Sequence, residues 1–284
     1  MNRQKTEKVT VTRSLLQRFA AAPYTVWAVL FIVIPLIFVA YYAFTDRDFA
    51  FTLDNIKAFF TPKYMTILWR SVKLAVIATV ICLIIGYPAA YFIARTDPKR
   101  QKILIMLLML PMWMNFLIRT YAWMVLLQDT GVINSLLTSI GLKQMKLMYT
   151  EGAVVVGMVY DYLPYMVLPI YSIMTKLDHR LVEAASDLGC SPFGVFRKVI
   201  VPQSIPGVIS GIMMVFVPSI STFYISQKLG GGKFYLIGDA IETQFNSNNL
   251  HMAAAISFVL MVILLAGMFI MDRFSDGGEG GLIP

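Results

Sequence analysis

Charged residues are scarce in this chain. Only 14% of its 284 residues are Asp, Glu, Lys or Arg, whereas a soluble globular protein carries about 25%. Apolar residues make up 58% of the chain, and the mean hydropathy is +0.69. This composition excludes a disordered chain and argues against a soluble globular enzyme. It indicates a protein whose main solvent is lipid.

Residues that support metal or nucleophilic chemistry are also few. The two cysteines, Cys82 and Cys190, lie far apart and indicate neither a disulfide framework nor a thiolate metal site. The two histidines are likewise distant from each other. The glycines before Lys233 do not form a phosphate-binding loop, because Phe234 stands where Ser or Thr would hold magnesium. We therefore expect no catalytic residue, no metal and no cofactor in this chain.

Six apolar segments are long enough to cross a bilayer, which takes roughly 20 helical residues. The fifth is rich in Ser, Gly and Pro, which is typical of a helix that faces other helices or an aqueous path. The sequence thus predicts an all-α, polytopic membrane protein with six transmembrane helices. The predicted spans are Pro23–Phe44, Ser71–Ala94, Ile103–Leu127, Gly152–Met174, Ile205–Ser226 and Met252–Met271.

The distribution of Lys and Arg predicts the orientation of these spans. Fourteen of the 24 basic residues fall on one side of the predicted membrane, including a dense cluster at 95–102. The side richer in Lys and Arg is the cytoplasmic one, so we expect both termini in the cytoplasm. We attribute the net charge of +8 to topology rather than to nucleic-acid binding. The expected regions are a basic N-terminal segment (1–22), a transmembrane domain (23–271) and a cytoplasmic tail (272–284).

The loop between the fourth and fifth spans, about residues 176–203, carries the strongest motif. A small apolar stripe at helical spacing and two acids on another face predict a helix over 181–188; these residues are Leu181, Ala185 and Leu188, then Glu183 and Asp187. Gly189 suits the left-handed conformation that ends a helix. Ser191 and Pro192 are typical of the start of a second helix. The loop is therefore predicted to form two short helices joined by a glycine turn.

The same loop resembles the EAA loop of type I ABC importer permeases. The resemblance lies in Glu183-Ala184-Ala185, then Gly189 three residues later, then Ile200-Val201-Pro202. Only one residue separates Ile200 from Pro202, which departs slightly from the family pattern. The stretches 110–127, 159–178 and 223–245 resemble spermidine/putrescine permease subunits of the B type.

This resemblance implies the fold of the type I importers, similar to the methionine permease, in a bacterial inner membrane. It implies a permease subunit that translocates a polyamine and does not itself hydrolyse ATP. The implied partners are a second homologous permease, two ATP-binding subunits that hold ATP-Mg, and an extracytoplasmic solute-binding protein. The loop would form a coupling helix that docks on an ATP-binding subunit. The implied coupling residues are Leu181, Glu183, Ala184, Ala185, Asp187, Leu188, Gly189 and Pro202.

A path for polyamines needs carboxylates, carbonyls or aromatic faces, because these groups attract ammonium. Aromatic residues in membrane proteins also serve in interface belts and helix packing. The candidates for the substrate path are Trp113, Asn115, Tyr121, Asp161, Tyr162, Phe223, Tyr224 and Gln227. The predicted depth of Asp161 matches that of Arg119, so Asp161 either pairs with Arg119 or meets a substrate ammonium.

Two other functions are compatible with six spans. One is an importer permease for another small solute, such as thiamine, ferric iron or an amino acid. The other is a channel or secondary carrier, against which the EAA loop argues; we also find no inverted repeat of the kind that many carriers have.

The orientation can be tested by cysteine labelling in a variant in which Cys82 and Cys190 are replaced by serine. We expect a cysteine at position 99 to be shielded from an impermeant thiol reagent in intact cells and a cysteine at position 143 to react. The physical reason is the retention of Lys- and Arg-rich loops in the cytoplasm. The reverse labelling pattern would overturn the orientation.

Overall fold

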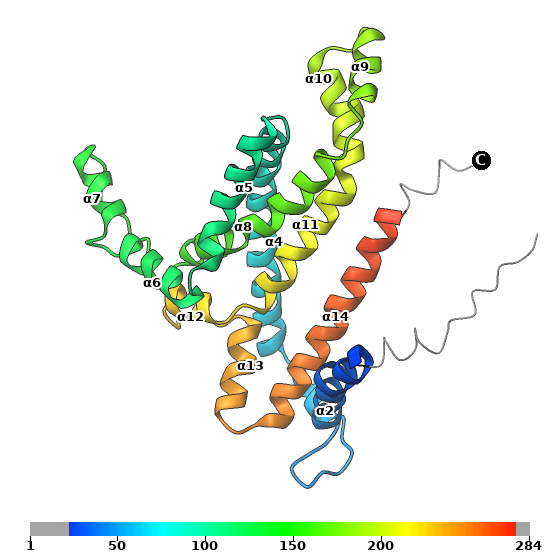
Figure 1. Ribbon diagram of the computed structural model, residues 1–284. Coiled ribbons are helices and arrows are strands. Elements are labelled where there is room, and N and C mark those ends of the chain that lie inside the picture. Colours follow the sequence, from blue (N-terminus) through cyan, green and yellow to red (C-terminus); the bar gives the residue numbers. More distant parts are fainter. Residues whose placement is uncertain (1–22, 277–284) are drawn as a thin grey trace, which may run out of the picture.

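The computed structural model describes residues 23–276, so the predicted segment 1–22 and residues 277–284 of the tail lie outside the described part (Figure 1). Within that part the chain is helical, and its β structure is limited to one isolated bridge between Thr45 and Phe51. The elements are η1 (Val29–Val33), α2 (Ile34–Ala43), α3 (Asp54–Phe59), α4 (Pro62–Ala94), α5 (Pro98–Trp113), α6 (Phe116–Leu127), α7 (Val132–Ser139), α8 (Glu151–Met174), α9 (His179–Asp187), α10 (Pro192–Val195), η2 (Phe196–Ile200), α11 (Val201–Ser221), α12 (Tyr224–Gly230), α13 (Ile237–Asn246) and α14 (Leu250–Asp276).

Five helices of the described part are long and apolar enough to cross a membrane, and a bent helix pair brings the number to six. The first span covers Pro23–Ala43 and includes the π-helical turn η1. Helix α4 begins at Pro62 rather than at Ser71, because a proline at the first helical position follows the extended residue Thr61. Helices α8 and α14 begin within two residues of the predicted spans.

The third span is broken, which corrects the prediction of one continuous helix over 103–127. Helix α5 ends at Trp113, Met114 is extended, and the helical segment from Phe116 leaves at 91° to α5. The side chain of Asn115 accepts a hydrogen bond of 2.8 Å from the backbone N–H of Leu117. This cap satisfies a donor that a continuous helix would have paired internally, and it starts α6 in a new direction.

The fifth span is shorter than predicted. Helix α11 ends at Ser221, and the separate helix α12 starts at Tyr224, whereas the sequence had predicted one helix as far as Ser226. The backbone of Gly238 approaches the end of α11 closely: a Cβ added there would lie 2.4 Å from the carbonyl oxygen of Ser221. The backbone at Gly238 therefore occupies the space that a further turn of α11 would need.

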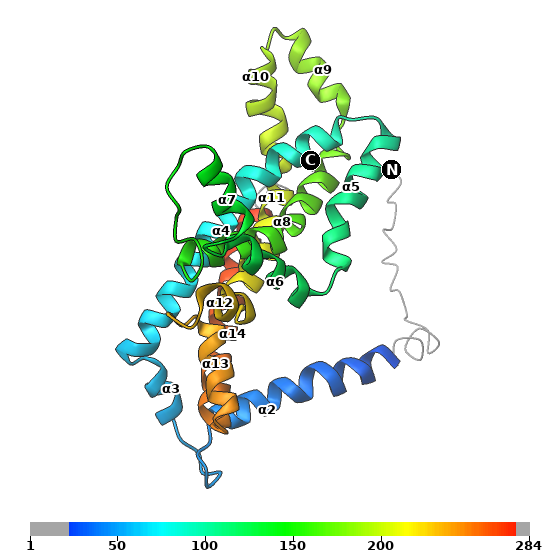
Figure 2. The same ribbon diagram turned by 90° about the vertical axis from the view of Figure 1, so that its left-hand side faces the viewer.

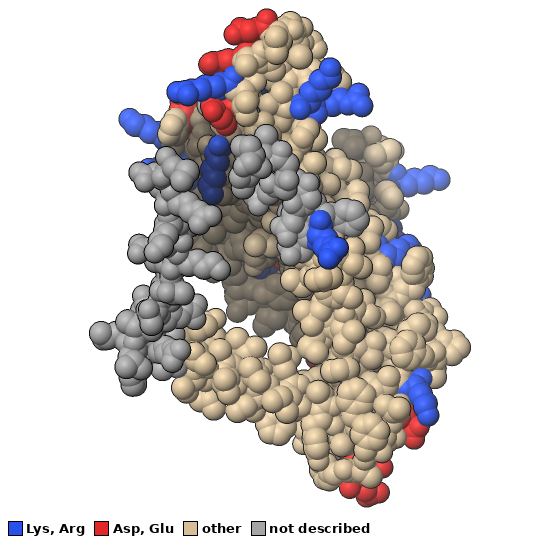
Figure 3. Space-filling model, turned by 90° about the vertical axis from the view of Figure 1, so that its right-hand side faces the viewer, with Lys and Arg blue, Asp and Glu red and all other residues tan. Residues whose placement is uncertain are grey.

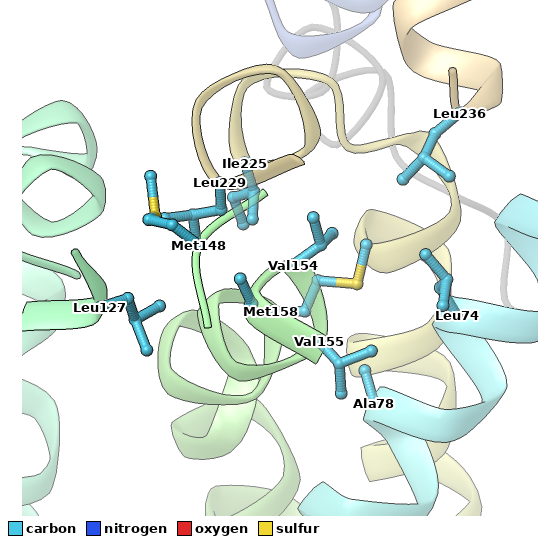
Figure 4. Close-up of a cluster of buried hydrophobic side chains, with 11 residues drawn as sticks. Leu74, Ala78, Leu127, Met148, Val154, Val155, Met158, Ile225, Leu229 and Leu236 are labelled. Atoms are coloured by element: carbon cyan, nitrogen blue, oxygen red, sulfur yellow. The ribbon is translucent and has the colours of Figure 1, made fainter. Parts of the chain in front are cut away.

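Helices α4, α8 and α11 form the centre of the bundle, and glycines let them approach one another. A Cβ added to Gly211 of α11 would lie 2.8 Å from the Met166 sulfur of α8, and one added to Gly207 would lie 2.9 Å from the carbonyl oxygen of Pro169. Small residues at such contacts are typical of membrane helices, whose association depends on close packing. A second core lies around Val154 and Met158 of α8, where α12 packs (Figure 4).

Two parts of the chain project from this centre. Helix α2 packs mainly on α14, and most of its side chains are exposed (Figure 2). Helices α9 and α10 protrude at one end of the molecule, opposite α13 (Figure 1). On the face shown in Figure 3, acidic side chains gather at these two ends, and most of the surface between them is uncharged. Such a surface fits a protein surrounded by lipid.

Candidate functional site

The loop at 176–203 forms the two short helices and the glycine turn that the sequence predicts. The carboxylate of Asp178 caps α9 by accepting a hydrogen bond of 2.9 Å from Arg180 N. Gly189 ends α9 with φ at +81°, a conformation that side chains with a Cβ adopt at a cost. The hydroxyl of Ser191 accepts a hydrogen bond of 3.2 Å from Gly194 N and so caps α10. Local sequence alone therefore determines the shape of this loop.

The loop presents apolar side chains outward instead of burying them. Leu188 is 86% exposed and Phe193 is 71% exposed. Leu181 is also exposed, while Ala185 is half-buried against the rest of the loop. The remaining predicted coupling residues Glu183, Ala184, Asp187, Gly189 and Pro202 are all exposed. Large exposed apolar side chains next to charged ones are typical of a protein contact surface.

At the opposite side of the centre, the two helix breaks meet. The ring of Phe116, the first residue of α6, lies 5.8 Å from the ring of Tyr224, the first residue of α12. The ring of Tyr121 packs edge-on against Tyr224 at 6.5 Å. The ammonium of Lys228 lies 5.6 Å from the centroid of each tyrosine ring. We call Phe116, Tyr121, Tyr224 and Lys228 the aromatic cluster.

The structure brings together only some of the predicted path residues. Tyr121 and Tyr224 meet in the aromatic cluster, and Gln227 donates a hydrogen bond to Glu242 of α13. Phe223 is exposed beside the cluster, whereas Trp113 lies at the end of α5 and is 74% exposed. The oxygen of Asn115 is used to cap α6.

Asp161 lies against Arg119 rather than in the aromatic cluster. Oδ1 of Asp161 is 2.9 Å from Nη1 of Arg119, and both side chains are buried. The contact is an ion pair without good hydrogen-bond alignment, and Nε of Arg119 has no hydrogen-bond partner among the described residues. The guanidinium also lies 5.7 Å from the ring of Phe116. The hydroxyl of Tyr162, next to Asp161, contacts the carbonyl oxygen of Pro218 at 3.5 Å.

The contacts of three residues at this site were not predicted from the sequence: Lys228, Glu242 and Asp239. The buried carboxylate of Asp239 accepts hydrogen bonds from the Ser226 hydroxyl at 2.9 Å and from Leu236 N at 2.8 Å. Burial raises the pKa of Asp239 to about 6, although both hydrogen bonds lower it. These contacts hold α12 against α13. The sequence signal for the Lys228 contact was the spacing of Tyr224 and Lys228, four residues apart on one helix face.

Comparisons with known proteins identify the family of this chain. Residues 83–277 match the family described as binding-protein-dependent transport system inner membrane component. The spermidine/putrescine transport system permease protein PotB of Haemophilus influenzae is 38% identical over 266 residues, which cover 90% of this chain and 93% of that protein.

Solved structures agree on the fold. A chain of a bacterial ABC transporter involved in the import of alginate aligns with a TM-score of 0.76 at 14% identity, covering 93% of this chain and 96% of that one. A chain of the MetNI methionine ABC transporter aligns with a TM-score of 0.58 at 15% identity, covering 77% and 99%. The predicted type I importer fold is thereby confirmed. The chain belongs to the family of binding-protein-dependent transport system inner membrane components, the permeases of ABC transporters.

Proposed function

We propose that this chain is the permease subunit of an ATP-driven importer for polyamines such as spermidine and putrescine. The observation that carries the proposal is the 38% identity to a spermidine/putrescine permease over 90% of the chain. The aromatic cluster supports it chemically. A lysine side chain ends in a primary ammonium, as a polyamine does, and here such a group already lies over two tyrosine rings.

The rest of the transporter would consist of other chains. A second homologous permease would form the path together with this one, and a solute-binding protein would deliver the substrate. ATP-Mg would be bound by two separate subunits, because this chain has no phosphate-binding loop. We assign α9 and α10 to the contact with an ATP-binding subunit, since Leu188 and Phe193 expose large apolar surfaces beside acids that can pair with a basic partner.

We expect movement of α9 and α10 to be coupled to movement at the aromatic cluster. Movement at α9 and α10 would turn the central helices, and this rotation would open or close the region where α6 and α12 meet. A substrate ammonium would then compete with Lys228 for the faces of Tyr121 and Tyr224. Selection among solutes would depend on these local contacts and on the solute-binding protein.

The substrate assignment can be tested by deleting the gene for this chain. We expect uptake of radiolabelled spermidine or putrescine to fall and a plasmid-borne copy to restore it, because no other subunit would complete the path. Uptake of thiamine and ferric iron serves as the matched control. Loss of thiamine or iron uptake with unchanged polyamine uptake would favour a permease for a different solute.

Substitution of the glycine turn tests the coupling assignment. Gly189→Val should abolish transport or assembly with the ATP-binding subunit while leaving membrane insertion intact, because valine fits poorly at φ +81°. Gly189→Asn should retain part of the activity, since asparagine tolerates this conformation better. Gly141→Val is a matched control: Gly141 also has φ +81° and open space around it, but it lies outside the loop. Normal transport by Gly189→Val would contradict the assignment.

The Arg119–Asp161 pair gives a further test, and we propose that its role is structural. Asp161→Asn leaves a buried guanidinium unpaired, which costs about 3–5 kcal/mol. We therefore expect less assembled complex and a lower melting temperature. The double variant Asp161→Asn, Arg119→Gln should restore part of that loss. Full assembly of Asp161→Asn with reduced polyamine uptake would instead make Asp161 a cation site, and unchanged assembly and uptake would exclude both roles.

A further inference from the structure

An aromatic side chain packs between the protruding α9–α10 arm and the central helices, next to the buried Ile200. Phe196, which directly follows α10, packs edge-on between two tyrosines of α4: its ring lies 5.3 Å from Tyr91 and 6.0 Å from Tyr87. Tyr87 is in turn tied to α11, because its hydroxyl lies 2.9 Å from the Ser204 hydroxyl. The guanidinium of Arg95 covers the other tyrosine, 4.4 Å from the Tyr91 ring. We call Tyr87, Tyr91 and Phe196 the aromatic joint.

The backbone at the joint is not a regular α-helix. Residues Phe196–Ile200 form the π-helical turn η2, in which Val201 N donates to Phe196 O. Pro202 follows and has no N–H to donate, so the regular pattern of α-helical hydrogen bonds is interrupted here. A π-helical turn inside a longer helix frequently marks a functional site. A bend at this turn breaks fewer regular hydrogen bonds than a bend elsewhere in the segment Pro192–Ser221.

Beside the joint, the contact between the loop and α4 includes a small cavity. A small cavity of about 30 Å³ lies between the ends of α4 and α8, with Val182 of α9 and Ile200 of η2 in its lining. Packing between the arm and α4 is therefore incomplete around the aromatic joint. The ring of Phe196 is the large side chain that bridges the two.

Helix α4 continues from the joint to the region of the aromatic cluster. Its 33 residues form one helix, and in the first third of it the Ser71 hydroxyl accepts a hydrogen bond of 2.7 Å from Ile237 N of α13. The Lys73 ammonium pairs with Glu151, the first residue of α8, at 2.9 Å. A displacement of Tyr87 and Tyr91, which flank Pro88, thus reaches α13 and the start of α8 along helix α4.

We propose that Phe196 is a positioning residue that transmits movement of the α9–α10 arm to α4. This proposal rests on the proposed function, because it assumes that ATP hydrolysis on a partner subunit moves the arm. The π-helical turn lets α10 swing relative to α11, and the ring of Phe196 makes α4 follow that swing. Without the ring, the arm would move and α4 would lag behind it.

The test measures substrate transported per ATP hydrolysed in the complete transporter reconstituted in liposomes. Phe196→Ala should leave basal ATP hydrolysis within about twofold of wild type, while the spermidine transported per ATP falls roughly tenfold, since two edge-on ring contacts are lost. Phe196→Tyr should restore coupling, because it keeps the ring. A merely structural role would lower assembly and ATP hydrolysis together and leave the ratio unchanged, which would overturn the proposal.

Two further variants make the result specific. Trp69→Ala removes an aromatic ring from α4 far from the joint; Trp69 is 71% exposed, so its coupling ratio should equal that of wild type. Phe196→Leu keeps apolar bulk without the ring and should show reduced coupling even if Phe196→Ala does not assemble. Wild-type coupling in Phe196→Leu, or equal loss in Trp69→Ala, would overturn the proposal. Absence of spermidine transport by the wild-type complex would instead reject the substrate assignment.

Discussion

Met166 of α8 lies between two glycines, Gly86 of α4 and Gly211 of α11, and this contact sets the spacing of the three central helices. A Cβ added to Gly86 would lie 3.0 Å from Met166 Cγ, and one added to Gly211 would lie 2.8 Å from its sulfur. Lipid offers no hydrophobic gain for helix association, so close packing of this kind has to supply the attraction. The loop at 176–203 and the region of the helix breaks both depend on it, because each is attached to an end of these helices.

Helices that begin inside a membrane protein expose backbone N–H groups, and side chains satisfy such groups at the starts of α6 and α13. Asn115 caps α6, the Ser71 hydroxyl accepts from Ile237 N, and Asp239 accepts from Leu236 N. An unpaired buried N–H would cost several kcal/mol in such surroundings. The need to pair these N–H groups gives Asn115, Ser71 and Asp239 a structural role. The ring faces of Tyr121 and Tyr224 instead carry the Lys228 ammonium, 5.6 Å from each centroid.

Sequence reasoning predicted the two helices and the turn of the loop at 176–203 well because the loop's shape is local. Asp178, Gly189 and Ser191 each act on backbone within three residues, so their spacing determines the two helices and the turn. The break at Asn115 was missed because the apolar run on both sides of it continues without interruption, and hydropathy does not report helix direction. Length and hydropathy likewise do not predict that α11 ends at Ser221. The backbone that blocks a further turn belongs to Gly238, which is distant in the sequence.

The aromatic cluster could not be predicted either, because it joins residues about a hundred positions apart, yet its electrostatics connect it to the buried ion pair. Two ring contacts link Arg119 to the cluster: its guanidinium lies 5.7 Å from Phe116, whose ring lies 5.8 Å from Tyr224. An uncompensated charge at roughly 10 Å would repel a substrate ammonium by about 1–2 kcal/mol at an effective dielectric constant near 20. Asp161 cancels that charge at 2.9 Å. The ion pair between α6 and α8 therefore removes one source of repulsion beside the aromatic cluster and leaves Lys228 as the cation that a substrate ammonium would displace. A structural role for Asp161 and a cation path beside it are thus compatible.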